Sequence, residues 1–198
     1  MPRFPILLTN DDGINSPGLQ HLASSLHSLG HPIAILAPLT EQSAVGMKLT
    51  LRDDMAFEEH TDIAEKIRTD ESAPLRVFSL DGSPCDCVIV AIDGGLRSLA
   101  PEIRPWLCIS GINRGPNLSI DVLHSGTVSA AREASLYGLP SLSVSLATYS
   151  HQDYSQSIEA TLALVERLSH LVTAEPSNML RQEGCLLYTS DAADESTR

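Results

Sequence analysis

The stretch Ile6-Leu7-Leu8-Thr9-Asn10-Asp11-Asp12-Gly13 decides the fold of this chain. Its first half is an unbroken apolar run, which is typical of a strand buried on both faces of a parallel sheet. Its second half is a polar loop that carries two adjacent carboxylates. Ser16-Pro17 then predicts a helix start, with Ser at the N-cap and Pro at the first helical position. A buried strand, a polar loop and a capped helix in this order indicate the start of a βαβ unit.

The same succession repeats outward along the chain. Leucines at helical spacing predict a helix over 17–29, which ends before Gly30 and Pro32, and an apolar run predicts a strand over 33–37. Further strands are expected at 76–80, 106–110 and 142–146, and further helices at 84–94, at 127–137 and from a capping box at Asp153 through Leu168. The pattern predicts an α/β fold, specifically a three-layer, Rossmann-like, doubly wound and mostly parallel sheet.

Residues 39–75 depart from this pattern. They are polar and irregular, and only 49–51 forms a candidate strand. The charged stretch 53–71 is expected to be an exposed excursion from the sheet.

Composition limits the classes of protein to be considered. The chain has 198 residues, 42% hydrophobic and 19% charged, which suits one globular domain. The sequence has no apolar run of about 20 residues and no signal-peptide core, so we expect a cytoplasmic protein without a membrane partner. A net charge of −12 without a basic run argues against binding a nucleic-acid polymer. The four cysteines lack paired zinc-site spacing and are expected to be reduced.

Asp11 and Asp12 are the first candidate functional residues. At the end of a strand both carboxylates can face one point, where they repel each other unless a cation neutralises them or one keeps its proton. Carboxylate oxygens favour Mg²⁺, Mn²⁺ or Ca²⁺. The alternative is an ordinary turn whose aspartate caps the next helix. A phospho-aspartate mechanism is disfavoured, because Asn10 stands where the attacking carboxylate would be.

Two further polar loops follow predicted strands or precede predicted helices. The loop 110–117, Ser-Gly-Ile-Asn-Arg-Gly-Pro-Asn, follows the strand at 106–110, and His124-Ser125-Gly126-Thr127 precedes the helix at 127–137. Free N–H groups at a helix N-terminus form an anion site. Each loop alone is also explained as a turn or an ordinary helix cap. The chain has neither a Gly-x-Gly-x-x-Gly motif nor a Gly-Lys-Ser/Thr motif, so a dinucleotide fold or a P-loop ATPase lacks support.

Taken together, these blocks resemble the SurE survival-protein family of 5′/3′-nucleotidases. The resemblance runs in order from about residue 5 to residue 150. Its five blocks are residues 7–13 with Pro17-Gly18, Ala37-Pro38 with Gln42-Ser43-Ala44, 81–88, 110–117 and 125–127. It implies a SurE-like fold and hydrolysis of nucleoside 5′-monophosphates, and of 3′-monophosphates as a second substrate class, by metal-activated water.

The resemblance also implies a set of site residues. One divalent cation per subunit, Mg²⁺ or Mn²⁺, would be bound by Asp11, Asp12, Ser43 and Asn113. Substrate phosphate would contact Asn117, Ser125, Gly126 and Thr127. Asp12 or Asp121 would accept the proton of the attacking water, and Asp121 matches a family acid that contacts the serine at 125.

The family's chains extend beyond residue 184, and the full-length protein is expected to form a homo-dimer or tetramer. Residues 1–184 are therefore assigned to an incomplete nucleotidase domain. Residues 185–198 resemble a translated sequencing adapter and are expected to be a non-native tail. Two alternatives stay open: a fragment that only binds metal or phosphate, and a nucleotide-binding module that needs no metal.

Overall fold

A computed structural model describes residues 3–171 and the backbone of 185–189. Its elements follow one another in the order expected for repeated βαβ units. In chain order they are β1 (Ile6–Thr9), α1 (Pro17–Ser28), β2 (Ile33–Pro38), β3 (Phe57–Glu59), α2 (Thr61–Ile67), β4 (Leu75–Leu80), α3 (Pro84–Val90), a π-helical turn (Ala91–Gly95), α4 (Leu96–Leu99), β5 (Leu107–Asn113), α5 (Asp121–His124), α6 (Gly126–Leu136), β6 (Ser141–Ser145), α7 (Ser155–Leu171) and β7 (Cys185–Thr189).

Within the described ranges, seven strands form one sheet in the order β3-β4-β2-β1-β5-β6-β7. All neighbouring pairs are parallel except β3 and β4, so the predicted doubly wound, mostly parallel sheet is confirmed. The chain moves outward from β1 in one direction through β2 and β4, and then in the other through β5 and β6. The sheet therefore has its topological switch point between β1 and β5, where ligands of such folds bind at the carboxyl ends of the strands.

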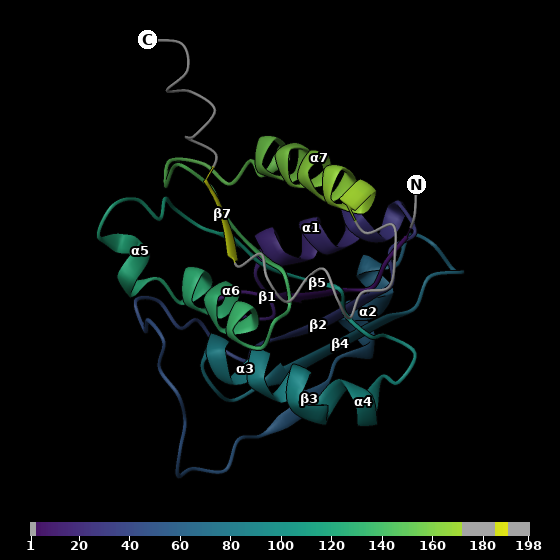
Figure 1. Cartoon of the computed structure of the whole chain (residues 1–198), viewed down its shortest axis with the longest axis horizontal. Coiled ribbons are helices and arrows are strands. Elements are labelled where there is room, and N and C mark those ends of the chain that lie inside the picture. The colour runs from purple at the N-terminus through teal and green to yellow at the C-terminus, as the bar shows by residue number, and fades with distance from the viewer. Residues whose placement is uncertain (1–2, 172–184, 190–198) are drawn as a thin grey trace.

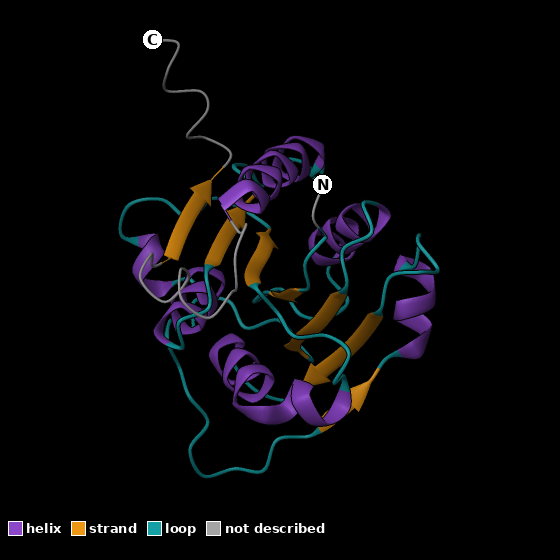
Figure 2. Cartoon of the chain, turned by 45° about the vertical axis from the view of Figure 1, so that its right-hand side comes forward, coloured by secondary structure: helices purple, strands orange, loops and turns teal. Residues whose placement is uncertain are grey.

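Helices cover both faces of the sheet and make a three-layer molecule (Figure 1, Figure 2). Leu8 and Ile35 belong to one buried cluster, which α1 and α7 cover, while Leu7 and Leu36 belong to the other, which α3 and α6 cover. Successive strand residues point to opposite faces, so a strand buried on both sides must be apolar throughout. This explains the unbroken run of apolar residues in β1, all of which are fully buried.

The helix starts agree with their sequence signals, but the side chains differ in what they contact. Ser16 is the N-cap of α1, yet its hydroxyl accepts a hydrogen bond from the Asn10 amide at 2.6 Å and does not cap the helix. Ser83 and Asp86 form a complete capping box at α3, a pairing that Ser83-Pro84 only partly indicated. The Asp153 carboxylate accepts from the Ser155 backbone N–H at 3.0 Å. The predicted capping box would have paired it with Gln156, one residue later.

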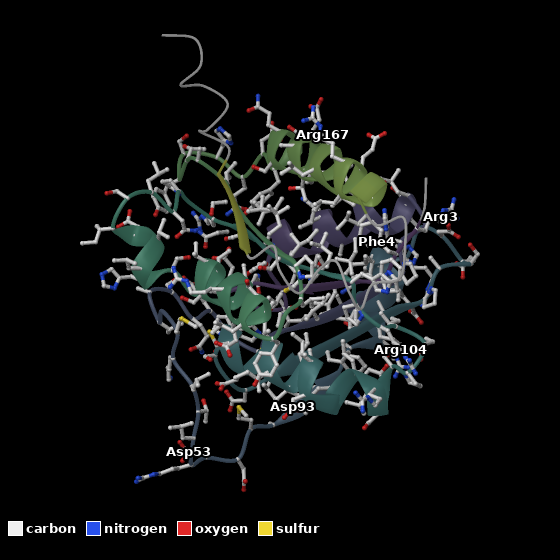
Figure 3. All side chains as sticks on the ribbon, viewed as in Figure 1. Arg3, Phe4, Asp53, Asp93, Arg104 and Arg167 are labelled. Atoms are coloured by element: carbon white, nitrogen blue, oxygen red, sulfur yellow. The ribbon has the colours of Figure 1, made fainter. Side chains whose placement is uncertain are left out.

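The stretch 39–75 corrects two expectations. Residues 49–51 are not a strand, and the charged stretch is not wholly exposed. It contains β3 at the sheet edge and α2, whose Ile63 and Ile67 are buried in the core. Charged residues on the outer side of α2 conceal a short apolar face, so composition alone misses it. Figure 3 shows Asp53, which belongs to the exposed part, on a loop that extends away from the sheet.

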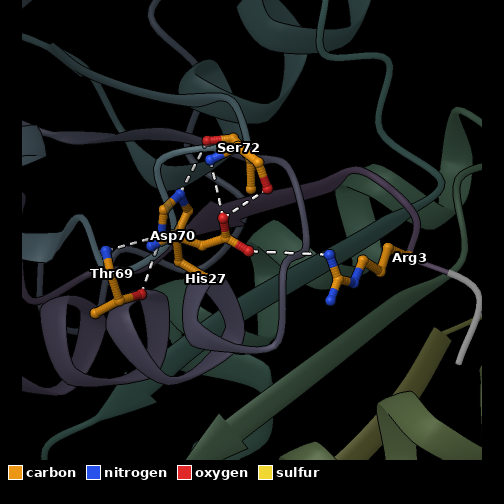
Figure 4. A network of polar contacts seen from close by, with 6 residues as sticks. Arg3, His27, Thr69, Asp70 and Ser72 are labelled. Atoms are coloured by element: carbon orange, nitrogen blue, oxygen red, sulfur yellow. Dashed lines mark hydrogen bonds and ion pairs between the residues drawn. The ribbon is translucent and has the colours of Figure 1, made fainter.

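His27 on α1 fixes the chain between α2 and β4 (Figure 4). Its ring is fully buried, and Nδ1 accepts from the backbone N–H groups of Thr69 at 3.0 Å and Asp70 at 3.1 Å. Nε2 lies 3.1 Å from the carbonyl oxygen of Ala73, which it reaches as a donor. One side chain thus satisfies three backbone groups of the connection.

Two elements differ from the sequence prediction at a glycine. The helix expected over 84–94 divides into α3, the π-helical turn and α4, and Gly94 at φ +116° marks the break. Strand β5 runs on through Gly111 to Asn113. At Gly111, with φ +141°, a Cβ atom would lie 2.3 Å from the Val144 carbonyl oxygen, so glycine lets the strand continue beside β6.

Cys85, Cys87 and Cys108 are buried as reduced thiols, as expected. Among the described helices none is long and apolar enough to cross a membrane. Of the expected non-native tail, Cys185–Thr189 pairs with β6 as β7, while 190–198 lies outside the described residues. The origin of this segment stays a prediction.

Candidate functional site

A cavity of about 800 Å³ opens at the switch point, beyond the carboxyl ends of β1 and β5. Its walls come from the loops after β1, β2, β5 and β6. Seven of the residues assigned to the site from sequence lie in its lining: Asp11, Asp12, Ser43, Asn113, Asn117, Asp121 and Ser125. The fold therefore brings together residues that are more than a hundred positions apart in the chain.

Asp11 occupies the floor of this cavity and is only 4% exposed. Its carboxylate accepts hydrogen bonds from the Thr127 hydroxyl and from backbone N–H groups of Gly126 and Thr127. Burial is the largest influence and raises the pKa of Asp11, while these hydrogen bonds oppose the rise. A Cβ atom on Gly126 would lie 2.8 Å from the Asp11 Cβ, so glycine lets the carboxylate reach the start of α6.

The N-terminus of α6 therefore already binds an anionic side chain. Besides the two N–H groups that serve Asp11, that of Val128 donates to the Ser125 hydroxyl at 3.1 Å and that of Ser129 to the Ser125 carbonyl at 3.0 Å. The sequence suggested that free N–H groups here would bind phosphate. The structure gives these four groups other partners, so contacts of Gly126 and Thr127 with phosphate would require an exchange of hydrogen bonds and stay a prediction.

Asp12 lies beside Asp11 and is half-buried. Its Oδ2 accepts from the backbone N–H of Arg114 at 2.9 Å, which links the loops after β1 and β5. The pKa of Asp12 is raised to about 6, first by burial and then by the negative charges of Asp11 and Glu41, against the opposing hydrogen bond from Arg114. Two carboxylates that repel each other in this way form an arrangement that a cation would stabilise.

The two other predicted metal ligands, Asn113 and Ser43, come from different segments of the cavity lining. The Asn113 side chain donates its N–H to the Gly115 carbonyl at 2.8 Å, and its Oδ1 lies 3.3 Å from the Thr127 hydroxyl. Ser43 is exposed and donates its hydroxyl to Glu41 at 2.6 Å. Both side chains keep an oxygen with free lone pairs, as a metal ligand requires.

The remaining predicted residues have clear structural partners. Asn117 is buried and donates its amide to the Ser145 hydroxyl at 2.7 Å, so that it ties the loop after β5 to β6. Asp121 is exposed. It contacts Ser125 through the backbone, where the Ser125 N–H donates to the Asp121 carbonyl at 2.9 Å. The role of either carboxylate, Asp12 or Asp121, as the proton acceptor stays a prediction.

Sequence reasoning missed several residues of the lining. Glu41 stands two positions from Ser43 and adds a fourth carboxylate to the cavity, beside those of Asp11, Asp12 and Asp121. Tyr149, Gln152 and Tyr154 reach the cavity from the connection between β6 and α7. A loop at the carboxyl end of a fourth parallel strand is the one signal that would have drawn attention to them.

The residues present fit a hard divalent cation. Among the described residues no group of three or more His, Cys, Asp and Glu side chains gathers as a metal site. The candidate set instead combines two carboxylates with an amide oxygen and a hydroxyl oxygen, all facing one cavity. An all-oxygen set with few charges is typical of Mg²⁺ or Mn²⁺ bound together with water and substrate oxygens.

Known proteins of one family are similar to this chain in sequence and in fold. The family model described as "Survival protein SurE" matches residues 6–187. A protein named 5′-nucleotidase SurE from Syntrophotalea carbinolica is 43% identical over 166 residues, and one from Synechococcus elongatus is 41% identical over 165. Each alignment covers 83% of this chain and 59% of the relative. The SurE protein from Aquifex aeolicus superposes with a TM-score of 0.68 at 28% identity, over 93% of this chain and 66% of that one. The present chain thus spans about three fifths of the length of the two curated relatives.

Proposed function

Because this chain belongs to the SurE survival-protein family, we propose that it is a metal-dependent phosphomonoesterase. Its proposed substrates are nucleoside 5′-monophosphates, with 3′-monophosphates as a second class, and its products are the nucleoside and phosphate. Curated relatives at about 40% identity carry the name 5′-nucleotidase, which supports the reaction and the 5′ substrate class.

The adjacent carboxylates of Asp11 and Asp12 at the switch point carry this proposal. They face a cavity of about 800 Å³, which is within the usual range for pockets that enclose small molecules. Together with Ser43 and Asn113 they would hold one Mg²⁺ or Mn²⁺ ion. The bound cation would supply Lewis-acid polarisation of the phosphoryl group and of the attacking water.

The protein's own residues divide the remaining work. Asp11 is hydrogen-bonded to the start of α6, so its carboxylate would be a rigid ligand for the cation. Asp12 has a pKa of about 6 without the cation, so above that pH it is ionised and can accept a proton from water. Asp121 faces the same cavity and is the second candidate for this role. The backbone N–H of Arg114 fixes the orientation of Asp12. The exposed side chain of Arg114 lines the cavity and can contact phosphate.

A substrate panel tests the proposal. Hydrolysis of 5′- and 3′-monophosphates should require Mg²⁺ or Mn²⁺, stop with EDTA and return when the metal is restored. Asp12→Asn should abolish this metal-dependent hydrolysis and leave the circular dichroism spectrum unchanged. Metal-dependent turnover by that variant would refute the assignment. Nucleotide binding that EDTA does not affect would instead favour a metal-free binding module, and metal binding without turnover would favour the fragment reading.

A further inference from the structure

One wall of the cavity is a segment without regular structure, which we call the wall segment (residues 39–51). All of it is described, and it forms neither helix nor strand. It supplies Glu41 and Ser43 to the cavity lining. A segment of this kind holds its shape only through contacts with its surroundings, because regular hydrogen bonding within it is missing.

Backbone hydrogen bonds fix its first half. Gln42 N–H donates to the Asp11 carbonyl at 2.7 Å, and Gly46 N–H donates to the His124 carbonyl at 2.8 Å. These contacts leave the second half, from Met47 onward, to be held by other groups.

Asp86 and Ser83 at the start of α3 hold that second half. The Asp86 carboxylate accepts from the Thr50 backbone N–H at 3.0 Å and from the Thr50 hydroxyl at 2.8 Å. The Ser83 hydroxyl donates to the Lys48 carbonyl at 2.6 Å. These three bonds cross about 36 residues of sequence, and together they join the wall segment to a helix that packs in the core.

Capping α3 does not require this arrangement. A capping box needs only the two reciprocal bonds between Ser83 and Asp86, which are also present at 2.8 and 3.1 Å. The Asp86 side chain is in addition buried, in a chain with a net charge of −12. Burial raises the pKa of Asp86, but the hydrogen bonds from Thr50 and Ser83 outweigh it and lower the pKa, so the carboxylate stays ionised. Ionised acceptors make the stronger hydrogen bonds.

We infer that Asp86 is a positioning residue for the candidate site: with Ser83 it holds the second half of the wall segment and thereby limits the movement of the first half, which carries Glu41 and Ser43 in the cavity lining. It touches neither substrate nor metal and acts through the segment that carries Ser43. The inference rests on the proposed function for its catalytic consequence, while the attachment itself can be measured without activity.

Trypsin cleavage after Lys48 measures the attachment directly. The scissile carbonyl is the one that Ser83 contacts, so cleavage requires that the wall segment leave α3. Asp86→Asn should raise the rate of cleavage after Lys48 by about tenfold or more, since it weakens bonds to an ionised acceptor. Cleavage after Lys66, in the separate helix α2, should stay unchanged. Asp70→Asn is the matched control, because that carboxylate accepts from the N–H and the hydroxyl of Ser72 and pairs with Arg3 at 3.9 Å, and none of these residues belongs to the wall segment.

A pair of substitutions at Thr50 separates attachment from helix capping. Thr50→Val removes the hydroxyl and leaves the capping box intact, so it should also accelerate cleavage after Lys48. Thr50→Ser keeps a hydroxyl and should behave as the unchanged protein. This pair also decides the question if Asp86→Asn does not fold.

Metal titration tests the consequence at the site. Thr50→Val and Asp86→Asn should raise the Mn²⁺ concentration for half-saturation by about tenfold, measured by the paramagnetic signal of free Mn²⁺, and change kcat much less at saturating Mn²⁺. Faster cleavage at Lys48 with an unchanged Mn²⁺ affinity would overturn the positioning role. Equal acceleration at Lys48 and Lys66 would overturn it too, because it indicates global unfolding. If no variant or parent hydrolyses nucleotides, the proposed function fails, while cleavage and Mn²⁺ binding still decide the role of Asp86.

Discussion

Asp12→Asn should stabilise the metal-free protein at neutral pH, although it removes a residue of the proposed reaction. The folded state raises the pKa of Asp12 from 3.8 to about 6, with burial as the largest cause. A raised carboxyl pKa means that the folded state holds its proton at a pH where the unfolded state has lost it. The contribution of Asp12 to stability is therefore largest below about pH 4 and declines as the pH rises through the window from about 4 to about 6.

The size of the effect follows from the same two values. One pKa unit corresponds to about 1.4 kcal/mol, so the rise to about 6 amounts to at most about 3 kcal/mol at neutral pH. Asp12 is only half-buried, and solvent screening reduces this figure to about 1–2 kcal/mol. Asparagine has nearly the same shape, carries no charge and still offers an oxygen to the Arg114 N–H, so it should recover this free energy.

Urea unfolding with excess EDTA measures the difference. The single tryptophan, Trp106, packs against the core and reports unfolding by fluorescence. We expect Asp12→Asn to unfold at higher urea than the parent at about pH 7.5, and at nearly the same urea at about pH 4. Asp53→Asn, on the exposed loop, should change neither value. A variant that is less stable than the parent at about pH 7.5, or equally shifted at both pH values, would refute the reasoning.

Three further substitutions, the first with a control, test the packing around the site and the fold. Gly126→Ala should cost about 1–3 kcal/mol of unfolding free energy, because the new Cβ atom would lie 2.8 Å from the Asp11 Cβ. The control Gly82→Ala should cost less, because its Cβ atom would lie 2.7 Å from the flexible side chain of Met55, and thermal melts compare the two variants. Thr127→Val leaves buried Asp11 without its hydroxyl donor, so urea unfolding should show a loss of about 1–3 kcal/mol, and a neutral result would contradict the contact. His27→Leu leaves three backbone groups without their partner and should cost at least about 2 kcal/mol by urea unfolding, with faster exchange of the two amides that donate to its ring; protected amides would count against this anchor.

Local patterns in the sequence suffice to predict most of the fold. The apolar run of β1 and the Ser-Pro pairs before α1 and α3 are signals that act within a few residues, so they identify elements without knowledge of their neighbours. The parallel order of the sheet then follows from the alternation of strands and helices.

Features that depend on distant contacts could not be predicted in this way. Strand β3 has three exposed residues and exists because it pairs with β4. The hydroxyl of Ser16 bonds to Asn10, a partner that its N-cap position does not reveal. The hydrogen bond between Asp11 and Thr127 joins the loop after β1 to the start of α6. The separate motifs of these two segments do not predict that the carboxylate of one binds the helix start of the other.

Some residues of the candidate site could be identified from the sequence, and others could not. Aspartates at the end of β1 and the loop after β5 lie at the carboxyl ends of central strands, where a doubly wound sheet places its ligands. Glu41 and the tyrosines after β6 were missed, because a single charged or aromatic residue in a loop is common and carries no spacing rule. Asp86 was matched to a family block, but its bonds to Thr50 needed the folded chain.

The contact between Asp11 and Thr127 also bears on the order in which this protein folds. The two residues are 116 positions apart, and strands β1 and β5, which bring them together, are separated by nearly as much. During synthesis the cavity cannot form until α6 has left the ribosome, so the first strand must wait for a partner made much later. An ion bound there would contact both halves of the sheet and would favour the complete fold over any partly folded state. Residues that hold such an ion would then serve the assembly of the chain as well as its chemistry.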